Sequence, residues 1–185
     1  RPRSVEADGA ILDAAIEIFA ECGLDGLTVE GVAARAGVGK ATIYRRYPGK
    51  VELVVAATRC FTQAGEPAPD TGTTRGDLRA LVEGLITMLT TTPLGRALPI
   101  LVAARARVPE LDGAYAEIVA EKRSRSAQVV RRGIDRGDLR SDIDPDLVVD
   151  VVVSPVFYRF LVTGAPFDSV FVEQLVDSTL RAFAG

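Results

Sequence analysis

The sequence contains no histidine, no tryptophan and no asparagine among its 185 residues. Histidine is the commonest general base and the commonest protein ligand of metals. Its absence excludes Ser-His-Asp catalysis, Cys-His catalysis and His-based metal hydrolysis. The absence of asparagine removes every acceptor for N-glycosylation. We therefore predict a protein that is not an enzyme, with no catalytic residue, no metal site and no cofactor.

Cysteine is also scarce, since Cys22 and Cys60 are the only two. Two cysteines in a chain of this length do not make the disulfide framework of a small secreted domain. We expect both to be reduced residues of the core. The first ten residues carry charges where a signal peptide would be apolar. The longest apolar run, residues 147–162, is interrupted by two charged residues and a proline, so no membrane span is predicted. These features predict a cytoplasmic protein without a membrane partner.

Apolar residues recur at the spacing of α-helices throughout the chain, and the alternation typical of strands is absent. Hydrophobic residues make up 48% and charged residues 25%, the balance of an ordinary globular protein. The pattern predicts an all-α fold of about nine helices. They are expected at about residues 7–22, 29–36, 40–47, 50–63, 74–91, 94–106, 109–136, 145–163 and 168–183.

Residues 65–73 read GEPAPDTGT, a composition typical of turns and linkers. We expect a domain boundary here. The first domain covers residues 1–63 and includes a helix-turn-helix at about 28–47 followed by a connecting helix. The second covers residues 74–185.

Two short predicted helices joined by a glycine turn lie between Thr28 and Lys50, the spacing of a helix-turn-helix. Residues 31–50 contain five basic residues and no acidic one, although the whole chain has a net charge of −3. Such a charge run alone also describes a solvated basic face. The turn spacing favours a surface that binds DNA.

At 100° per residue, Ile43 and Tyr47 of the second helix share one face, which we expect to pack inward. Ala41, Thr42 and Arg45 point the opposite way. Arginine reads guanine in the major groove, and a small side chain meets a thymine methyl. The other candidates are assigned to phosphates, with Thr28 and the N-termini of the flanking helices adding donors. The predicted DNA-binding residues are Thr28, Lys40, Ala41, Thr42, Tyr44, Arg45, Arg46, Tyr47 and Lys50.

The stretch from Ile11 to Lys50 resembles the N-terminal domain of TetR-family transcriptional regulators. The resemblance rests on Ile11-Leu12, Ala14-Ala15, Phe19-Ala20, Gly23, Thr28-Val29, Ala36-Gly37-Val38, Ile43-Tyr44, Tyr47 and Lys50. Gly39 departs from it, because many members have serine there. The resemblance implies a bacterial repressor that binds a palindromic operator in double-stranded DNA as a homodimer and responds to a small-molecule effector.

The second half, from Arg131 to Asp168, resembles a C-terminal domain found in one TetR subgroup. The predicted helix at 145–163 is apolar almost all round, which is typical of a helix buried on every side. The resemblance implies that the last two helices form a four-helix bundle with those of the partner. An ordinary monomer core is the alternative. The predicted dimer-interface residues are Val149, Val152, Val153, Val156, Phe160, Phe171 and Leu175.

An effector pocket of apolar walls with few polar anchors is expected among the middle helices. The same residues would also suit a plain helical core. The candidates are Leu85, Met88, Leu89, Leu101, Arg105, Tyr115, Ile118 and Phe157. Two other hypotheses stay open at this point, namely an all-α enzyme or small-molecule carrier, and a monomeric interaction module.

Overall fold

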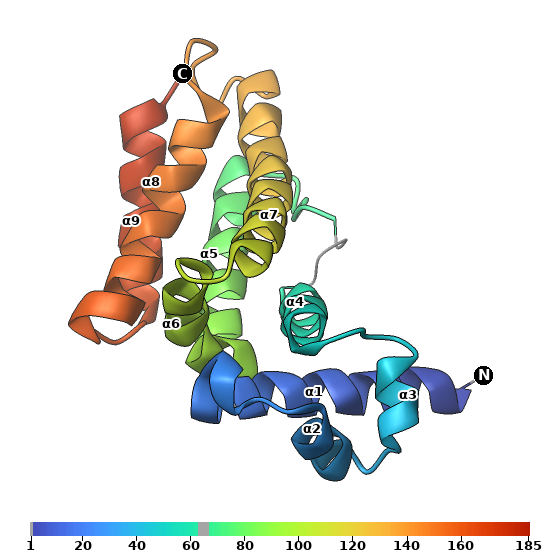
Figure 1. Cartoon of the computed structure of the whole chain (residues 1–185). Helices are drawn as coiled ribbons and strands as arrows, with labels where there is room; N and C mark the ends of the chain where they lie inside the picture. The colour runs from blue at the N-terminus through green and yellow to red at the C-terminus, as the bar shows by residue number, and fades with distance from the viewer. Residues whose placement is uncertain (1, 63–66) are drawn as a thin grey trace. The chain divides into compact units, whose positions relative to one another are not determined.

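A computed structural model describes the chain except residues 1 and 63–66, with side chains from residue 6 onward (Figure 1). The described residues form nine α-helices and one π-helical segment, η1, which confirms the predicted all-α fold. The helices are α1 (Pro2–Gly26), α2 (Val29–Ala36), α3 (Lys40–Tyr44), α4 (Lys50–Phe61), α5 (Thr74–Thr91), α6 (Pro93–Arg105), α7 (Pro109–Asp135), α8 (Pro145–Tyr158) and α9 (Ser169–Phe183), and η1 covers Arg159–Thr163.

These elements group into two compact units. The first unit holds α1 to α4, the end of α5 from Thr90, α6 and the start of α7 up to Ile118. The second holds α5 up to Leu89, the rest of α7 from Val119, α8, η1 and α9. The chain thus crosses between units more than once. The expected boundary at residues 65–73 lies partly outside the described residues, at positions 65 and 66, and position 63 of the fourth predicted helix lies outside them too.

Most helix ends fall within two residues of the predicted ones, with three differences. Helix α1 begins at Pro2 and continues past a kink at Gly23, whose φ is 67°. Helix α3 ends at Tyr44 instead of Tyr47, and the chain goes on as a turn. The helix expected at 145–163 changes from α to π geometry at Arg159.

Helix α1 is the centre of the first unit and packs against α2, α4 and α6. Its buried face carries Ile11, Ala15, Ile16 and Phe19, all with no exposed surface. The spacing i, i+4, i+5 and i+8 is that of one face of a helix. Large apolar side chains buried on one stripe hold α2, against which α3 packs, and both of these helices are too short to be stable alone.

The two cysteines lie on the surface, which corrects the expectation that they belong to the core. Both are exposed and unoxidised. The Cys22 thiol donates a hydrogen bond to the carbonyl of Ile18, at 3.1 Å. A helical cysteine can donate its thiol hydrogen to the carbonyl four residues earlier, so the thiol has a partner without being buried.

A fully buried carboxylate organises the start of the second unit. Asp77, in the first turn of α5, accepts hydrogen bonds from the backbone and the hydroxyl of Thr71, at 2.6 and 2.8 Å. Arg132 and Arg136 of α7 reach it at 3.4 and 3.2 Å. Burial by itself raises the pKa of the Asp77 carboxyl, but the hydrogen bonds from Thr71, Arg136 and Arg132 outweigh it and hold that pKa below its usual range. This cluster ties the segment before α5 to α7.

Helices α8 and α9 lie side by side in the second unit (Figure 1). Four of the predicted interface residues are buried inside the subunit, namely Val149, Val152, Val156 and Phe171. Val153, Phe160 and Leu175 are half-buried. The four buried residues are covered by their own chain. The assignment of the seven residues to a dimer interface stays a prediction.

The exposed apolar side chains of α8 and η1 form a different row, here called the outer stripe. It consists of Leu147, Val151, Tyr158, Leu161 and Val162, each between 39% and 67% exposed. Their spacing of 4, 7, 3 and 1 residues keeps them on one side of the helix. A helix apolar all round thus divides into one face for its own core and one face open to solvent.

No single helix among residues 2–62 and 67–185 is both long and apolar enough to cross a membrane, although α5 and α6 would meet the criterion if taken together.

Candidate nucleic-acid interface

The turn between α2 and α3 is fixed by two local features. The Thr28 hydroxyl accepts a hydrogen bond from the amide of Gly31 at 3.0 Å and so caps α2. Gly37 ends α2 with φ 67° and ψ 30°, and its amide donates to the carbonyl of Ala33. This left-handed conformation strains any residue with a Cβ, so glycine suits the turn that redirects the chain into α3.

Helix α3 turns one side chain into the unit and leaves the others outside. Ile43 is fully buried, and α3 packs against α2. Ala41, Tyr44 and Arg45 are exposed, and Thr42 is half-exposed. This is the division expected from the sequence at 100° per residue. The N-cap of α3 is Gly39, which offers no side-chain bond to the helix.

Arg45 is the free cation of this surface. It has no ion pair or hydrogen bond of its side chain anywhere in the described parts of the chain. No described residue therefore holds its guanidinium, which leaves its five donors available to another molecule.

The other cations of the motif are engaged by the protein itself. Arg46 Nη1 lies 2.6 Å from Asp8 Oδ1 of α1. Lys50 donates a hydrogen bond to the carbonyl of Leu24 at 2.9 Å. Lys40 pairs with Glu30 at 3.0 Å, in a fully exposed contact that holds the pKa of the Glu30 carboxyl below its usual range. Sequence patterns do not give these pairs, because their partners lie on other helices.

Tyr47 is half-buried beside the Asp8–Arg46 pair. Burial raises the pKa of its phenol, and the negative charge of Asp8 raises it further. Because α3 ends at Tyr44, Tyr47 lies in the turn that follows, where its amide donates to the carbonyl of Ile43 at 2.9 Å.

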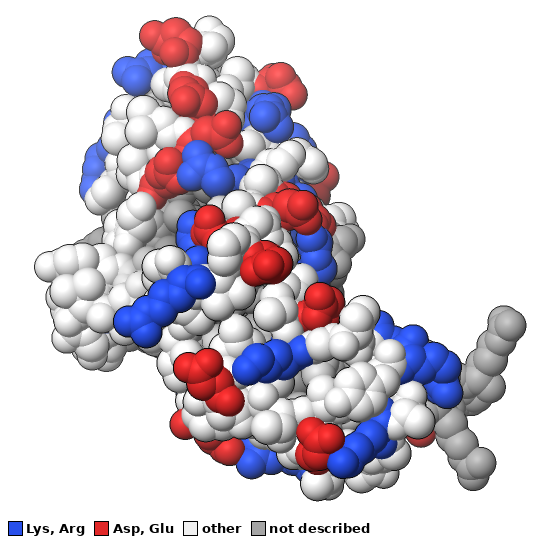
Figure 2. All heavy atoms as spheres, in the orientation of Figure 1, with Lys and Arg blue, Asp and Glu red and all other residues white. Residues whose placement is uncertain are grey.

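Basic side chains surround the position of α3 on the face seen in Figure 2, with acidic ones interspersed. Arg35, on α2, is bound by both oxygens of Glu21, at 2.8 Å each. Three of the five basic residues at 31–50, namely Arg35, Lys40 and Arg46, are therefore paired with acidic residues of the same unit. Among the described residues, Arg45, which follows the last residue of α3, has no such partner.

The predicted effector residues divide between the two units. Leu101, Arg105, Tyr115 and Ile118 belong to the first, and Leu85, Met88, Leu89 and Phe157 to the second. Leu89, Leu101 and Ile118 are buried, as core residues would be. The Arg105 guanidinium lies 4.7 Å from the centre of the Tyr115 ring. Burial raises the pKa of the Tyr115 phenol, against the effect of Arg105.

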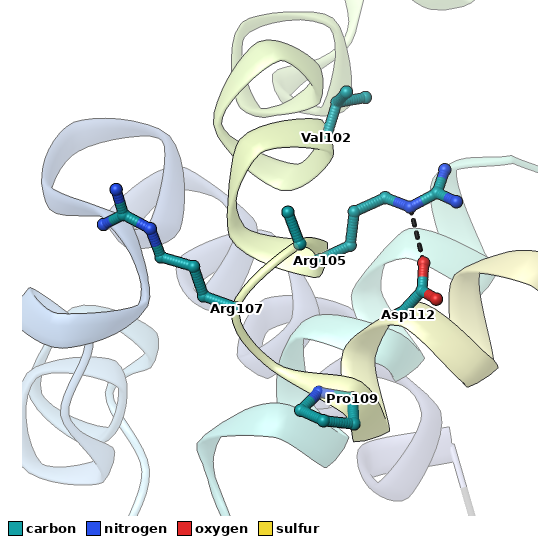
Figure 3. Close-up of a pocket in the computed structure, with 6 residues that line it drawn as sticks. Val102, Arg105, Arg107, Pro109 and Asp112 are labelled. Carbon is teal, nitrogen blue, oxygen red and sulfur yellow. Dashed lines mark hydrogen bonds and ion pairs between the residues drawn. The ribbon is translucent and has the colours of Figure 1, made fainter.

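A hollow of about 450 Å³ opens at the turn between α6 and α7 (Figure 3). It is lined by Val102, Arg105, Ala106, Arg107, Pro109 and Asp112. Arg105 Nε donates to Asp112 at 2.7 Å, whereas Arg107 points to the other side. Of the eight predicted effector residues, Arg105 lines this hollow and the other seven do not. No three acidic or cysteine side chains within the described ranges gather closely enough to hold a metal ion.

The short helix with a buried inner residue, the glycine turn and the exposed arginine define a helix-turn-helix protein of the class that binds DNA. Two family models match the chain. The model of bacterial regulatory proteins of the tetR family covers residues 11–57, and the tetracyclin repressor-like C-terminal domain covers residues 68–179.

Individual relatives agree with this. The HTH-type transcriptional regulator YdeS of Bacillus subtilis is 31% identical over all of this chain and 92% of its own length. The HTH-type regulator AqdR of Rhodococcus erythropolis is 34% identical over 71% of this chain and 63% of its own. The crystal structure of the TetR-family regulator SCO0332 superposes with a TM-score of 0.74 and 31% identity, covering 97% of this chain and all of that one. The chain belongs to the TetR family of transcriptional regulators.

Proposed function

We propose that the protein is a homodimeric repressor that reads a palindromic operator through α3 and is released by a small, largely apolar effector. The observation that carries this proposal is the unpartnered guanidinium of Arg45 on the outer face of a helix whose inner face is held by Ile43. A buried inner residue and a free outer arginine are what a helix needs to enter a major groove and read it.

In the proposed complex, α3 lies in the major groove with its small residues first. Ala41 and Thr42 allow close approach and meet thymine methyls, and Arg45 makes the bidentate contact to guanine O6 and N7. Tyr44 and Lys40 contact phosphates, which fix the register without reading sequence. Thr28 caps α2. In this complex the first amides of α2 contact a phosphate of the DNA backbone.

Dimer formation is supported by the outer stripe of α8 and η1. Five large apolar residues exposed in one row are more than a monomeric surface usually leaves uncovered. A second copy, related by a twofold axis, would cover them with the same residues of its own. The axis relates the α3 helices of the two copies. They then read two half-sites one turn of the DNA apart, about 34 Å, and the operator is a palindrome.

Repression and effector response are supported by the relatives. The regulator from Mycobacteroides abscessus, 30% identical over 96% of this chain and 94% of its own, is named a transcriptional repressor. The solved SmeT structure, 26% identical with a TM-score of 0.71, is a complex with triclosan. The effector acts by favouring a conformation of the dimer in which the two α3 helices are no longer spaced to enter successive major grooves of the operator.

The test is selection of DNA. The purified protein is mixed with duplexes of randomised sequence, and bound duplexes are amplified and sequenced. We expect a palindromic sequence to be enriched and to bind with an affinity that falls steeply with salt. Failure to enrich any sequence at low salt would refute the proposal and favour a carrier or an interaction module. Release of the selected duplex by triclosan-like apolar compounds at constant ionic strength, but not by sugars, tests the effector part.

A further inference from the structure

One contact just after α3 is not explained by base reading, because it joins Arg46 to Asp8 near the start of α1. Asp8 Oδ1 and Arg46 Nη1 lie 2.6 Å apart, and both atoms are shielded from solvent although their side chains are partly exposed. Removing a charge from water is costly unless a partner offsets it. The pair therefore commits this edge of Arg46 to the protein and withdraws it from phosphates.

Helix α3 depends on such a tether. It has five residues, far fewer than a helix needs to be stable alone, and Ile43 is its one buried residue. Its N-cap contributes no side-chain bond. After Tyr44 the chain continues as a turn, in which the amides of Arg46 and Tyr47 both donate to the carbonyl of Ile43 at 2.9 Å. A turn with this little support frays unless something outside holds it.

The direction of Arg45 follows from that of Arg46. Successive residues in a helical turn point about 100° apart. Arg45 keeps helical backbone angles, with φ −65° and ψ −23°. Once Asp8 holds Arg46 against α1, Arg45 is turned away from α1 and toward the open side of α3.

We propose that Asp8 and Arg46 are positioning residues for sequence reading, which fix the end of α3 against α1 so that Arg45 is presented to the groove. This inference rests on the proposed function, because it concerns how the DNA-reading side chain is aimed. It assigns Arg46 a role different from the phosphate contact expected from the sequence.

A simple electrostatic argument makes the opposite prediction. Asp8 places a negative charge beside a DNA-binding surface, so its removal would strengthen binding to all DNA. If Asp8 positions α3, its removal weakens binding to the preferred sequence alone. Asp13 provides a matched control, because it lies on the same helix, is exposed, and has no ion pair within the described chain.

The experiment compares Asp8→Asn and Asp13→Asn on two probes, the duplex selected by the wild-type protein and a random duplex of equal length. We expect Asp8→Asn to lose about tenfold in affinity for the selected duplex and to keep or slightly improve its affinity for the random one. Asp13→Asn changes neither beyond a slight gain. In an Arg46→Gln background, Asp8→Asn should cause no further loss, because the pair is already broken.

Equal behaviour of the two asparagine variants would overturn the inference, as would an equal loss on both probes or additive losses with Arg46→Gln. Thermal melting establishes that each variant is folded at the assay temperature. If Asp8→Asn melts too early, Asp8→Glu replaces it: the charge stays, the carboxylate moves by one methylene, and a smaller loss on the selected duplex alone is expected. A wild-type protein that selects no sequence refutes the proposed function itself, which is a different outcome.

Discussion

Arg45 and Arg46 are adjacent in the chain and have opposite environments. The guanidinium of Arg46 lies against the Asp8 carboxylate in a solvent-shielded contact, whereas that of Arg45 has no partner in any part of the chain that the structure describes. Arg46 thus holds the end of α3 against α1, and Arg45 reaches outward. The sequence gives both residues the same charge, so this difference is visible only in the structure, where α1 and α3 are placed together.

Val151 and Val152 provide a test of which face of α8 meets a partner. Val151 is 39% exposed on the outer stripe and Val152 is 1% exposed in the core. We expect Val151→Glu to stay folded and to dissociate into single chains of 19.7 kDa, because a charge opposes burial in a dimer. Val152→Ala should keep the dimer but lower the free energy of unfolding by about 1–3 kcal/mol, through the cavity it leaves.

Light scattering and denaturant unfolding distinguish these results. Loss of the dimer in Val152→Ala with an unchanged dimer in Val151→Glu would return the interface to the residues first expected from the sequence.

The fold was largely predictable because its signals are local. Helix ends lie at Thr28, Gly37, Asp144 and the first prolines of α6, α7 and α8, and the rules that place such residues there involve neighbouring residues alone. The inner and outer faces of α3 followed from periodicity in the same way.

The remaining features depend on contacts between distant segments. Hydrophobicity identified α8 as buried but gave no means of telling Val152 from Val151, because both are valines in a helix with apolar residues on nearly every side. The partners of Arg46 and Lys50 are a carboxylate and a backbone carbonyl of α1, and no spacing rule links them. The cysteines were expected inside because cysteine is usually buried, a statistical tendency that says nothing of these two positions.

Asp77 should make stability depend on pH in the acidic range. Its folded-state pKa is lowered, so its contribution to stability is full above its ordinary pKa of about 4 and is lost as pH falls through the lower folded value. Asp77→Asn removes the carboxylate from Arg132 and Arg136, and we expect a loss of about 2–3 kcal/mol at pH 7. The variant should also lose less stability than the wild type between about pH 4 and pH 2.

Thermal melting across that pH range provides the measurement. Identical pH profiles for Asp77→Asn and the wild type would show that the buried cluster does not carry the charge interaction ascribed to it.

Lys50 and Lys40 are expected to differ although both were assigned to phosphates. The Lys50 ammonium is bonded to the Leu24 carbonyl, in the last turn of α1 where carbonyls lack helical partners. Lys50→Met should therefore cost about 1–2 kcal/mol of stability and leave the salt dependence of DNA binding nearly unchanged. Lys40 is exposed, and its pairing with Glu30 is worth little. Lys40→Met should leave stability unchanged and reduce the salt slope by about 1. Binding titrations at several salt concentrations separate the two, and a reversed pattern would contradict these assignments.

The most direct test of the whole account is the affinity of Arg45→Ala for the selected duplex and for a random duplex of the same length. Arg45 is the cation proposed to read a base, and no ion pair or hydrogen bond within the described residues holds its side chain. We predict a loss of about 1–3 kcal/mol on the selected duplex, relaxed preference at one position of each half-site, and a much smaller loss on random DNA. Equal losses on the two duplexes would show that Arg45 contacts phosphates only, and that α3 does not read sequence in the way proposed.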